Sequence, residues 1–468
     1  MPAAGASGHT ALVDFGRFAI GGATLLLLVV AFALAVESPL YGLAVPAAVL
    51  AVGAGLALTR VPLGHLCGVI LFFGVTARSK AGVQIEEVVF AAYYLGYLAT
   101  WLGSRLWVYR EPIFRSPVDL CVGGFLVYMT GSIGLTVLFG GDLSYARADW
   151  INFSMLGFYF PIREVCERYR WGPWLVVGFV LYLGLFSLVR NVAMFSSALS
   201  GAEHAWQVAR GRVPMNEMLL LVPALGCLGF AAHEPLGRRW ALYTAGFALF
   251  TVGVILTQWR AYYVDLAVGA ALFFVLLGWR QRGRLTLATA LSGAIGLGFG
   301  YLVFGDLMTL LVTGILDRIL SIGTSTTADI SLLNRLLETE SVWDRIRQNP
   351  IVGYGIGTTF SFFDSIYEAT WTKSYAHNGY LTLWFKFGII GLGLILWTWG
   401  ASITSSYRTW RRGATDAERT LGVVLAVVLI SLIPSHFVSA TFSTSDTVMM
   451  FAILTGTTAG LAHRTQAR

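Results

Sequence analysis

Apolar runs of 17 or more residues recur along almost the whole length of this chain of 468 residues. Each run is long enough to cross the hydrocarbon core of a bilayer, about 30 Å, as a helix. Spanning segments are restricted to helices and closed barrels, because every backbone amide in the core needs a partner within the protein. A barrel needs strands of about ten residues with alternating polarity, a pattern that this chain lacks. The sequence therefore predicts an all-α, polytopic transmembrane helical bundle.

Composition and charge agree with a membrane protein. Hydrophobic residues make up 56% of the chain and charged residues 12%, about half the charged fraction of soluble domains. This excludes a soluble enzyme and a disordered chain. The net charge of +7 does not indicate nucleic acid as a partner, because no basic run is long or aromatic-rich enough to follow a phosphate backbone. The four cysteines show no metal-type spacing. We expect no metal and no cofactor.

The arginine distribution sets the expected topology. Arginines cluster in the connections at 110–115, 163–170, 238–239, 280–284 and 408–419, which an even helix count places on one face. By the positive-inside rule this face is cytoplasmic, so both termini are predicted inside. The segment 147–162 is short and either spans the membrane or is re-entrant. We expect about 12–14 helices, at 16–36, 39–59, 62–77, 86–108, 118–140, 147–162, 173–199, 215–233, 238–257, 261–279, 285–304, 378–402, 420–438 and 445–462.

One connection, 305–377, is far longer than the others and is predicted to be extracytoplasmic. Apolar residues at 332, 333, 336, 337, 343 and 346 follow the period of an amphipathic helix over 329–349. Pro350 ends that helix, which we expect to lie on the membrane surface or over the bundle as a lid. We divide the chain into N-terminal helices (1–237), helices leading to the loop (238–304), the loop itself (305–377) and C-terminal helices (378–468).

Polar residues near the outer face are the candidates for chemistry. Arg260 lies at the outer junction of two predicted helices, Arg335 on the loop helix, and His377 directly before the helix that leaves the loop. Each residue also has a purely structural interpretation. Arg260 would be a snorkelling arginine, Arg335 part of a solvated helix face, and His377 a helix cap. Asp265 and Lys386 are intramembrane charges and hence candidates, although either could be structural.

Glycines 353, 355 and 357 resemble a dinucleotide fingerprint only superficially, since the spacing is wrong and the preceding segment is predicted to be helix. A tight turn that returns the chain to the membrane explains Gly353 and Gly355 better.

Taken together, residues 240–400 resemble the bacterial O-antigen ligase and polymerase superfamily of lipid-linked-oligosaccharide glycosyltransferases. The resemblance rests on four features in the family's order: Arg260, then Arg335 fifteen residues before Pro350, then "NPIVGYGIGT", then "AHNGYLTLWFKFGIIGLG" with His377. The chain departs from the family where Thr339 stands in place of a frequent tryptophan.

The resemblance implies a metal-independent, inverting glycosyltransferase in the bacterial inner membrane with its active site facing the periplasm. Its donor is a glycan on undecaprenyl diphosphate, and further partners would be a chain-length regulator and a flippase. Arg260 and Arg335 suit binding of the diphosphate, since guanidinium stays ionised and grips phosphate oxygens. His377 suits the general base that deprotonates the acceptor hydroxyl. Asn378, Gly353, Gly355 and Asp265 are supporting candidates.

Three functions stay open at this point. A polymerase of surface-polysaccharide repeat units is favoured slightly over a ligase that transfers finished glycan to lipopolysaccharide core or protein. From another class, a secondary transporter would show inverted repeats and ionisable groups at the membrane midplane, and no convincing repeat is present. For a glycosyltransferase we expect the side chains of Arg260, Arg335 and His377 to meet at one outward-facing cavity.

Overall fold

The structure is a computed structural model that describes residues 112–200, 218–257, 259–305, 330–364 and 368–466, with scattered residues between 94 and 110. The chain separates into two compact units, Met1–Arg115 and Ser116–Arg468, and nearly all of the described residues belong to the second. The predicted helices at 16–36, 39–59 and 62–77 lie outside the described residues, and 86–108 is described only at scattered positions.

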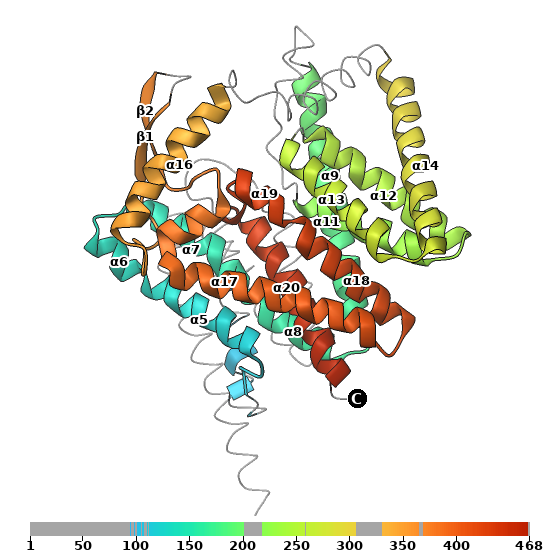
Figure 1. The fold of residues 1–468 in the computed structure, drawn as a ribbon, viewed down its shortest axis with the longest axis horizontal. Coiled ribbons are helices and arrows are strands. Elements are labelled where there is room, and N and C mark those ends of the chain that lie inside the picture. The colour runs from blue at the N-terminus through green and yellow to red at the C-terminus, as the bar shows by residue number, and fades with distance from the viewer. Residues whose placement is uncertain are drawn as a thin grey trace, which may run out of the picture. The chain divides into compact units, whose positions relative to one another are not determined.

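The second unit is built almost entirely of helices, which confirms the all-α prediction (Figure 1). One antiparallel pair of strands interrupts them. The elements are α5 (Pro117–Gly131), α6 (Ile133–Leu138), α7 (Leu143–Ser154), η3 (Met155–Phe158), α8 (Tyr159–Arg168), α9 (Gly172–Ser200), α11 (Met218–His233), α12 (Arg238–Leu256), α13 (Arg260–Leu276), α14 (Trp279–Phe304), α16 (Ile330–Gln348), β1 (Phe360–Asp364), β2 (Ala369–Lys373), α17 (Gly379–Arg412), α18 (Asp416–Ser431), α19 (Ile433–Val438), η4 (Thr441–Ser443) and α20 (Ser445–Gln466).

Within the described residues, five segments are long and apolar enough to cross a membrane: Pro117–Leu138, Gly172–Val192, Arg238–Leu256, Gly379–Arg412 and Asp416–Val438. These agree with the polytopic membrane protein predicted from hydropathy. The segment predicted at 147–162 lies within a continuous helical run from α7 through the 3-10 turn η3 to α8.

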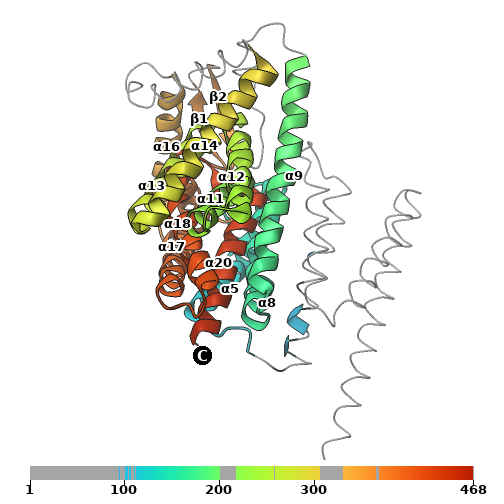
Figure 2. The same ribbon diagram turned by 90° about the vertical axis from the view of Figure 1, so that its right-hand side faces the viewer.

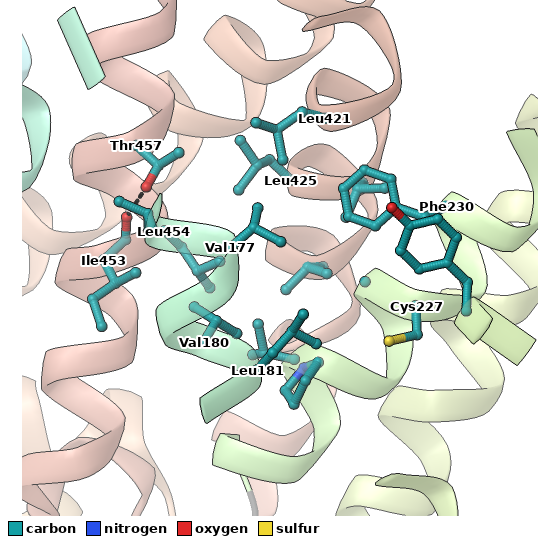
Figure 3. Close-up of a pocket in the computed structure, with 17 residues that line it drawn as sticks. Val177, Val180, Leu181, Cys227, Phe230, Leu421, Leu425, Ile453, Leu454 and Thr457 are labelled. Carbon is teal, nitrogen blue, oxygen red and sulfur yellow. Dashed lines mark hydrogen bonds between the residues drawn. The ribbon is translucent and has the colours of Figure 1, made fainter. Parts of the chain in front are cut away.

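The centre of the bundle is α11, which is buried along nearly its whole length and packs against α9, α12, α13, α14 and α18. A pocket within the bundle is lined by side chains of α9, α11, α12, α18 and α20 (Figure 3). Its lining is almost wholly apolar, and the hydroxyl of Thr457 is already used, donating to the Ile453 carbonyl at 2.7 Å. None of the residues that sequence analysis selected lines this pocket.

The glycine-rich turn after α16 docks into a break in α17. Gly388 has a φ of +61° within that helix, which glycine tolerates because it lacks a Cβ. The break frees two amides: Ile389 donates to the Pro350 carbonyl at 2.9 Å and Ile390 to the Ile351 carbonyl at 3.4 Å. The expected tight turn against the membrane helices is therefore present.

Glycines 353, 355 and 357 of this turn all have positive φ. A Cβ on Gly353 would overlap backbone atoms of Lys386 and Gly388, and one on Gly355 would overlap the Ser132 carbonyl. Both glycines thus permit a close approach of two backbones, as expected for a structural turn.

The remainder of the long loop forms a small subdomain on the first turns of α17. A hairpin, absent from the sequence prediction, pairs β1 with β2 so that Phe360 faces Lys373 and Phe362 faces Trp371. Its inner face packs with α16 and α17 in a cluster that holds Val342, Ile346, Tyr354, Phe360, Phe362, Ala376 and Phe385. Figure 2 shows α16 and the hairpin at one end of the bundle and the C-terminal end of α20 at the other.

The loop helix is confirmed as α16, but the predicted apolar stripe is wrong in its N-terminal half. Leu333 and Leu336 are 49% and 58% exposed. The buried face carries Asn334 and Glu338 instead, followed by Val342 and Ile346. The physical reason is that these two polar side chains find long-range partners: Asn334 Nδ2 donates to Asp364 Oδ1 of β1 at 2.6 Å, and Glu338 binds groups near α17.

Candidate functional site

His377 lies between the hairpin and α17. The strand β2 ends at Lys373, and Asn378 then caps α17, its side chain accepting from the Leu381 N–H at 3.0 Å. The His377 backbone N–H donates to Glu338 Oε2 at 3.0 Å, and its ring Nδ1 lies 2.7 Å from the same oxygen. The His377 side chain remains one-third exposed. Asn378 thus has a structural role as a helix cap next to a partly open imidazole.

Glu338 is the buried centre of this arrangement. Its other oxygen, Oε1, lies 3.4 Å from Lys373 Nζ. Burial acts to raise the pKa of this carboxyl, but the hydrogen bonds and charges of His377 together with the charge of Lys373 outweigh it and hold the pKa below its usual value. The carboxylate is therefore ionised at neutral pH.

Arg335 belongs to the same end of α16. It lies three residues before Glu338, and side chains three apart on a helix are neighbours, with Cβ atoms about 5–6 Å apart. Arg335 is half-buried, and its neighbour Asn334 is fixed to β1 through Asp364. His377 therefore contacts Glu338, and Arg335 lies one helical turn before Glu338 on α16, although 41 residues separate Arg335 from His377 in the chain.

Arg260 is the first residue of α13 and is exposed. The preceding Trp259 donates from its indole to Ser439 Oγ at 3.0 Å. The start of α17 approaches the same residue, since a Cβ on Gly379 would lie 3.5 Å from the Ser439 carbonyl oxygen. The first turns of α13 and α17 therefore adjoin one short segment after α19, which places Arg260 on the side of the bundle where His377 lies.

The two intramembrane charges are buried inside the bundle. Asp265 accepts from the Ser435 N–H at 3.1 Å, and its second oxygen has no hydrogen-bond partner among the described residues. Lys386 forms a buried ion pair with Asp149 of α7. Asp149 also accepts from the Gly357 N–H at 2.8 Å, so this pair fastens the glycine-rich turn. Lys386 is structural.

Sequence reasoning missed Glu338 and Lys373 as members of the site. The available signal was the spacing of Glu338, which follows Arg335 by three residues and therefore shares its side of the helix. Within the described part of the chain, no group of three or more His, Cys, Asp or Glu side chains is arranged to hold a metal ion.

Residues 245–396, from α12 through the first half of α17, match the family model described as O-antigen ligase. This match covers about a third of the chain and describes a similarity over that span. This confirms the resemblance to the O-antigen ligase and polymerase superfamily, and the matched span contains Arg260, Arg335 and His377.

A curated relative supports the same assignment. The chain is 28% identical over 133 residues to an O-antigen ligase of Salmonella typhimurium. The alignment covers 26% of this chain and 31% of the relative, so the chain matches about a third of that protein's length. The similarity of the chain to these proteins is therefore regional.

Proposed function

We propose that this protein is a membrane glycosyltransferase that moves a glycan from undecaprenyl diphosphate to an acceptor hydroxyl at the outer face of the bacterial inner membrane. The observation that carries the proposal is the contact of His377 with Glu338, one helical turn after Arg335 on α16, inside the span that matches the O-antigen ligase family. This pairs a cation suited to phosphate with a partly exposed imidazole.

In the proposed reaction, His377 accepts the proton of the acceptor hydroxyl as its oxygen attacks C1 of the donor sugar. The bond from C1 to the diphosphate oxygen breaks, and its electron pair leaves with undecaprenyl diphosphate. Arg260 and Arg335 bind the diphosphate oxygens and stabilise the negative charge that develops there. A single displacement of this kind inverts the anomeric centre, and the residues proposed for it require no metal ion.

The nature of the acceptor separates two forms of this activity. The sequence favours a polymerase slightly, whereas the family description and the Salmonella relative both carry the name of a ligase. These names support the ligase, which would transfer finished glycan to lipopolysaccharide core. A polymerase would instead extend a second lipid-linked glycan.

The test is reconstitution in proteoliposomes with purified undecaprenyl-diphosphate oligosaccharide. Wild-type protein should release undecaprenyl diphosphate, and a ladder of lipid-linked products would identify a polymerase. Product formed only when lipopolysaccharide core is added would identify a ligase. A protein that produces neither with these donors contradicts the proposal.

Three variants test the site itself. His377→Ala should lower the rate by about 10²- to 10⁴-fold, the contribution of a positioned base. Arg260→Ala and Arg335→Ala should each lower it by about 10- to 150-fold, since a hydrogen bond to a charged group contributes about 1.5–3 kcal/mol. The matched control is Arg347→Ala, an exposed arginine on the same helix α16, which should leave the rate unchanged. Wild-type rates in all three site variants would refute the assignment.

A further inference from the structure

We propose that Glu338 is a positioning residue for His377: it holds the imidazole with Nδ1–H toward the carboxylate and so presents Nε2 to the acceptor hydroxyl. This inference rests on the proposed function of His377 as the base. It adds a residue that acts through His377, together with Lys373, whose Nζ lies 3.4 Å from the other carboxylate oxygen of Glu338.

The contacts define one orientation of the ring. Glu338 Oε2 is shared by the backbone N–H and the ring Nδ1 of His377, at 3.0 and 2.7 Å. A carboxylate only accepts hydrogen bonds, so Nδ1 must carry the proton. In the neutral ring the lone pair then lies on Nε2, and one-third of the side chain is open to the outside. The nitrogen left available is the one able to take a proton.

The placement of Glu338 is not what stability alone would favour. Burying an ionised carboxylate is costly unless it is well paired, and α16 buries Glu338 while leaving Leu333 and Leu336 about half exposed. A rotation of the helix that exposed the carboxylate and buried the leucines would improve apolar burial. The hydrogen bonds to His377 and Lys373 compensate for the buried charge, and they exist only in this orientation.

Two parts of the chain supply the groups: α16, and the segment that runs from β2 into α17. Glu338 comes from α16, Lys373 from the last position of β2, and His377 from the link to α17. Besides Arg335 on the same helix, the described residue Tyr375 faces Glu338, and its pKa is raised by burial and by the Glu338 charge. Its ring lies edge to face against His377, with centroids 6.1 Å apart. The hairpin thus serves to deliver Lys373 and to restrain the imidazole.

The consequence for the reaction concerns the proton. When the acceptor hydroxyl gives its proton to Nε2, the ring becomes a cation whose Nδ1–H remains hydrogen-bonded to a negative carboxylate. That interaction is stronger in the charged product than in the neutral ring, so it favours proton transfer. Glu338 itself does not need to gain or lose a proton.

The experiment compares Glu338→Gln with Glu340→Gln in the reconstituted assay. Glu340 lies on the same helix and is exposed, so its variant controls for loss of charge on α16. Glutamine retains the shape of Glu338, but its amide can donate to Nδ1 and favour the unproductive tautomer. We expect kcat to fall by about 10- to 1,000-fold in Glu338→Gln, with the donor KM within about twofold of wild type. Glu340→Gln should match wild type in both.

The rate–pH profile supplies a readout that a purely structural role would not move. Removing the carboxylate charge in Glu338→Gln disfavours the imidazolium form, so the acidic limb should move to lower pH. Lys373→Gln removes a positive charge that favours ionised Glu338 and opposes the imidazolium form. Its acidic limb should therefore move to higher pH. Opposite displacements in the two variants are the signature of the proposed arrangement.

The outcomes separate this inference from the proposed function. If His377→Ala is inactive and Glu338→Gln has the wild-type kcat and pH profile, the positioning role is wrong and the base assignment stands. A loss in Glu338→Gln that lies wholly in KM also overturns the positioning role. If His377→Ala is fully active, the base assignment itself fails. Should Glu338→Gln fail to insert, Lys373→Gln decides, since its side chain is one-quarter exposed, and an unmoved acidic limb there refutes the proposal.

Discussion

The buried ion pair between Lys386 and Asp149 offers a sharp test of how the outer loop is held to the bundle. Lys386 lies in α17 next to the break at Gly388 and is fully buried, and Asp149 reaches it from α7. Asp149 also accepts from Gly357 at 2.8 Å. One carboxylate thus joins α7, α17 and the glycine-rich turn, and removing either charge leaves the other without a counter-ion.

The expected magnitude follows from the burial. Breaking a buried pair by removing one partner costs about 3–5 kcal/mol, because an uncompensated charge stays inside. Removing both charges leaves no such charge, and replacement of a whole buried pair is often close to neutral. We therefore expect Lys386→Met and Asp149→Asn each to be strongly destabilising, and the double variant to be far less so than the sum of the two.

The measurement is thermal unfolding of the purified protein in detergent, followed by tryptophan fluorescence, as a double-mutant cycle. The control is Arg347→Met, which breaks an ion pair with Asp344 whose side chains are 68% and 61% exposed. Exposed ion pairs contribute little to stability, so the control variant should unfold at the same temperature as the wild type. If the loss of stability in the double variant equals the sum of the two single losses, or if Lys386→Met is as stable as the wild type, the ion pair does not fasten the turn.

Two further predictions concern the same region. Gly388→Ala should loosen the turn at 350–357, because a Cβ at φ +61° would overlap the Ile351 carbonyl and the left-handed conformation alone costs about 1–2 kcal/mol. Limited proteolysis should therefore cut the loop of this variant faster than that of the wild type. The control is Gly393→Ala, which has open space around it and should be cut at the wild-type rate. The lowered pKa of Glu338 predicts that the loop subdomain gains stability from this group above pH 4.5 and loses it as the pH falls through the lowered pKa. Tryptophan fluorescence of the wild type should report that acid transition, and a transition that persists unchanged in Glu338→Gln would contradict its assignment to this carboxyl.

The helices of the second unit were largely predictable, because each depends on local composition. The run at 173–199 appears as Gly172–Ser200 and that at 238–257 as Arg238–Leu256. The prediction erred where a helix is interrupted, because hydropathy alone does not reveal a break within an apolar run. The stretch predicted at 420–438 is divided into α18 and α19, the latter with Pro434 in its first turn.

The loop was less predictable, because its structure depends on contacts between distant residues. The strands β1 and β2 have only five residues each, and the buried side of β1 is defined by α16. The face of α16 was mispredicted for the same reason. Hydropathy directs Leu333 and Leu336 inward, but hydrogen bonds across 30 and 39 residues turn Asn334 and Glu338 to the inside.

The candidate site shows the same division. Residue chemistry was enough to select Arg335 and His377, and their common position at the outer face of the membrane stays a prediction. Glu338 escaped selection because an acidic residue on a helix is usually solvated, and nothing local marks it as buried. The joint approach of all three predicted side chains to one cavity remains a prediction for the alanine variants of Arg260, Arg335 and His377 to test.

The break in α17 has a consequence for how such proteins diversify. Because the freed amides of Ile389 and Ile390 are taken by carbonyls of the segment that follows α16, the external subdomain is not a detachable module. A chimaera that exchanges only 330–377 between homologues would leave those amides mismatched, together with the surfaces on α6 and α7 that receive the glycines. Under the proposed function, a change of acceptor preference should therefore require exchange of the adjoining parts of α6, α7 and α17 together with the loop.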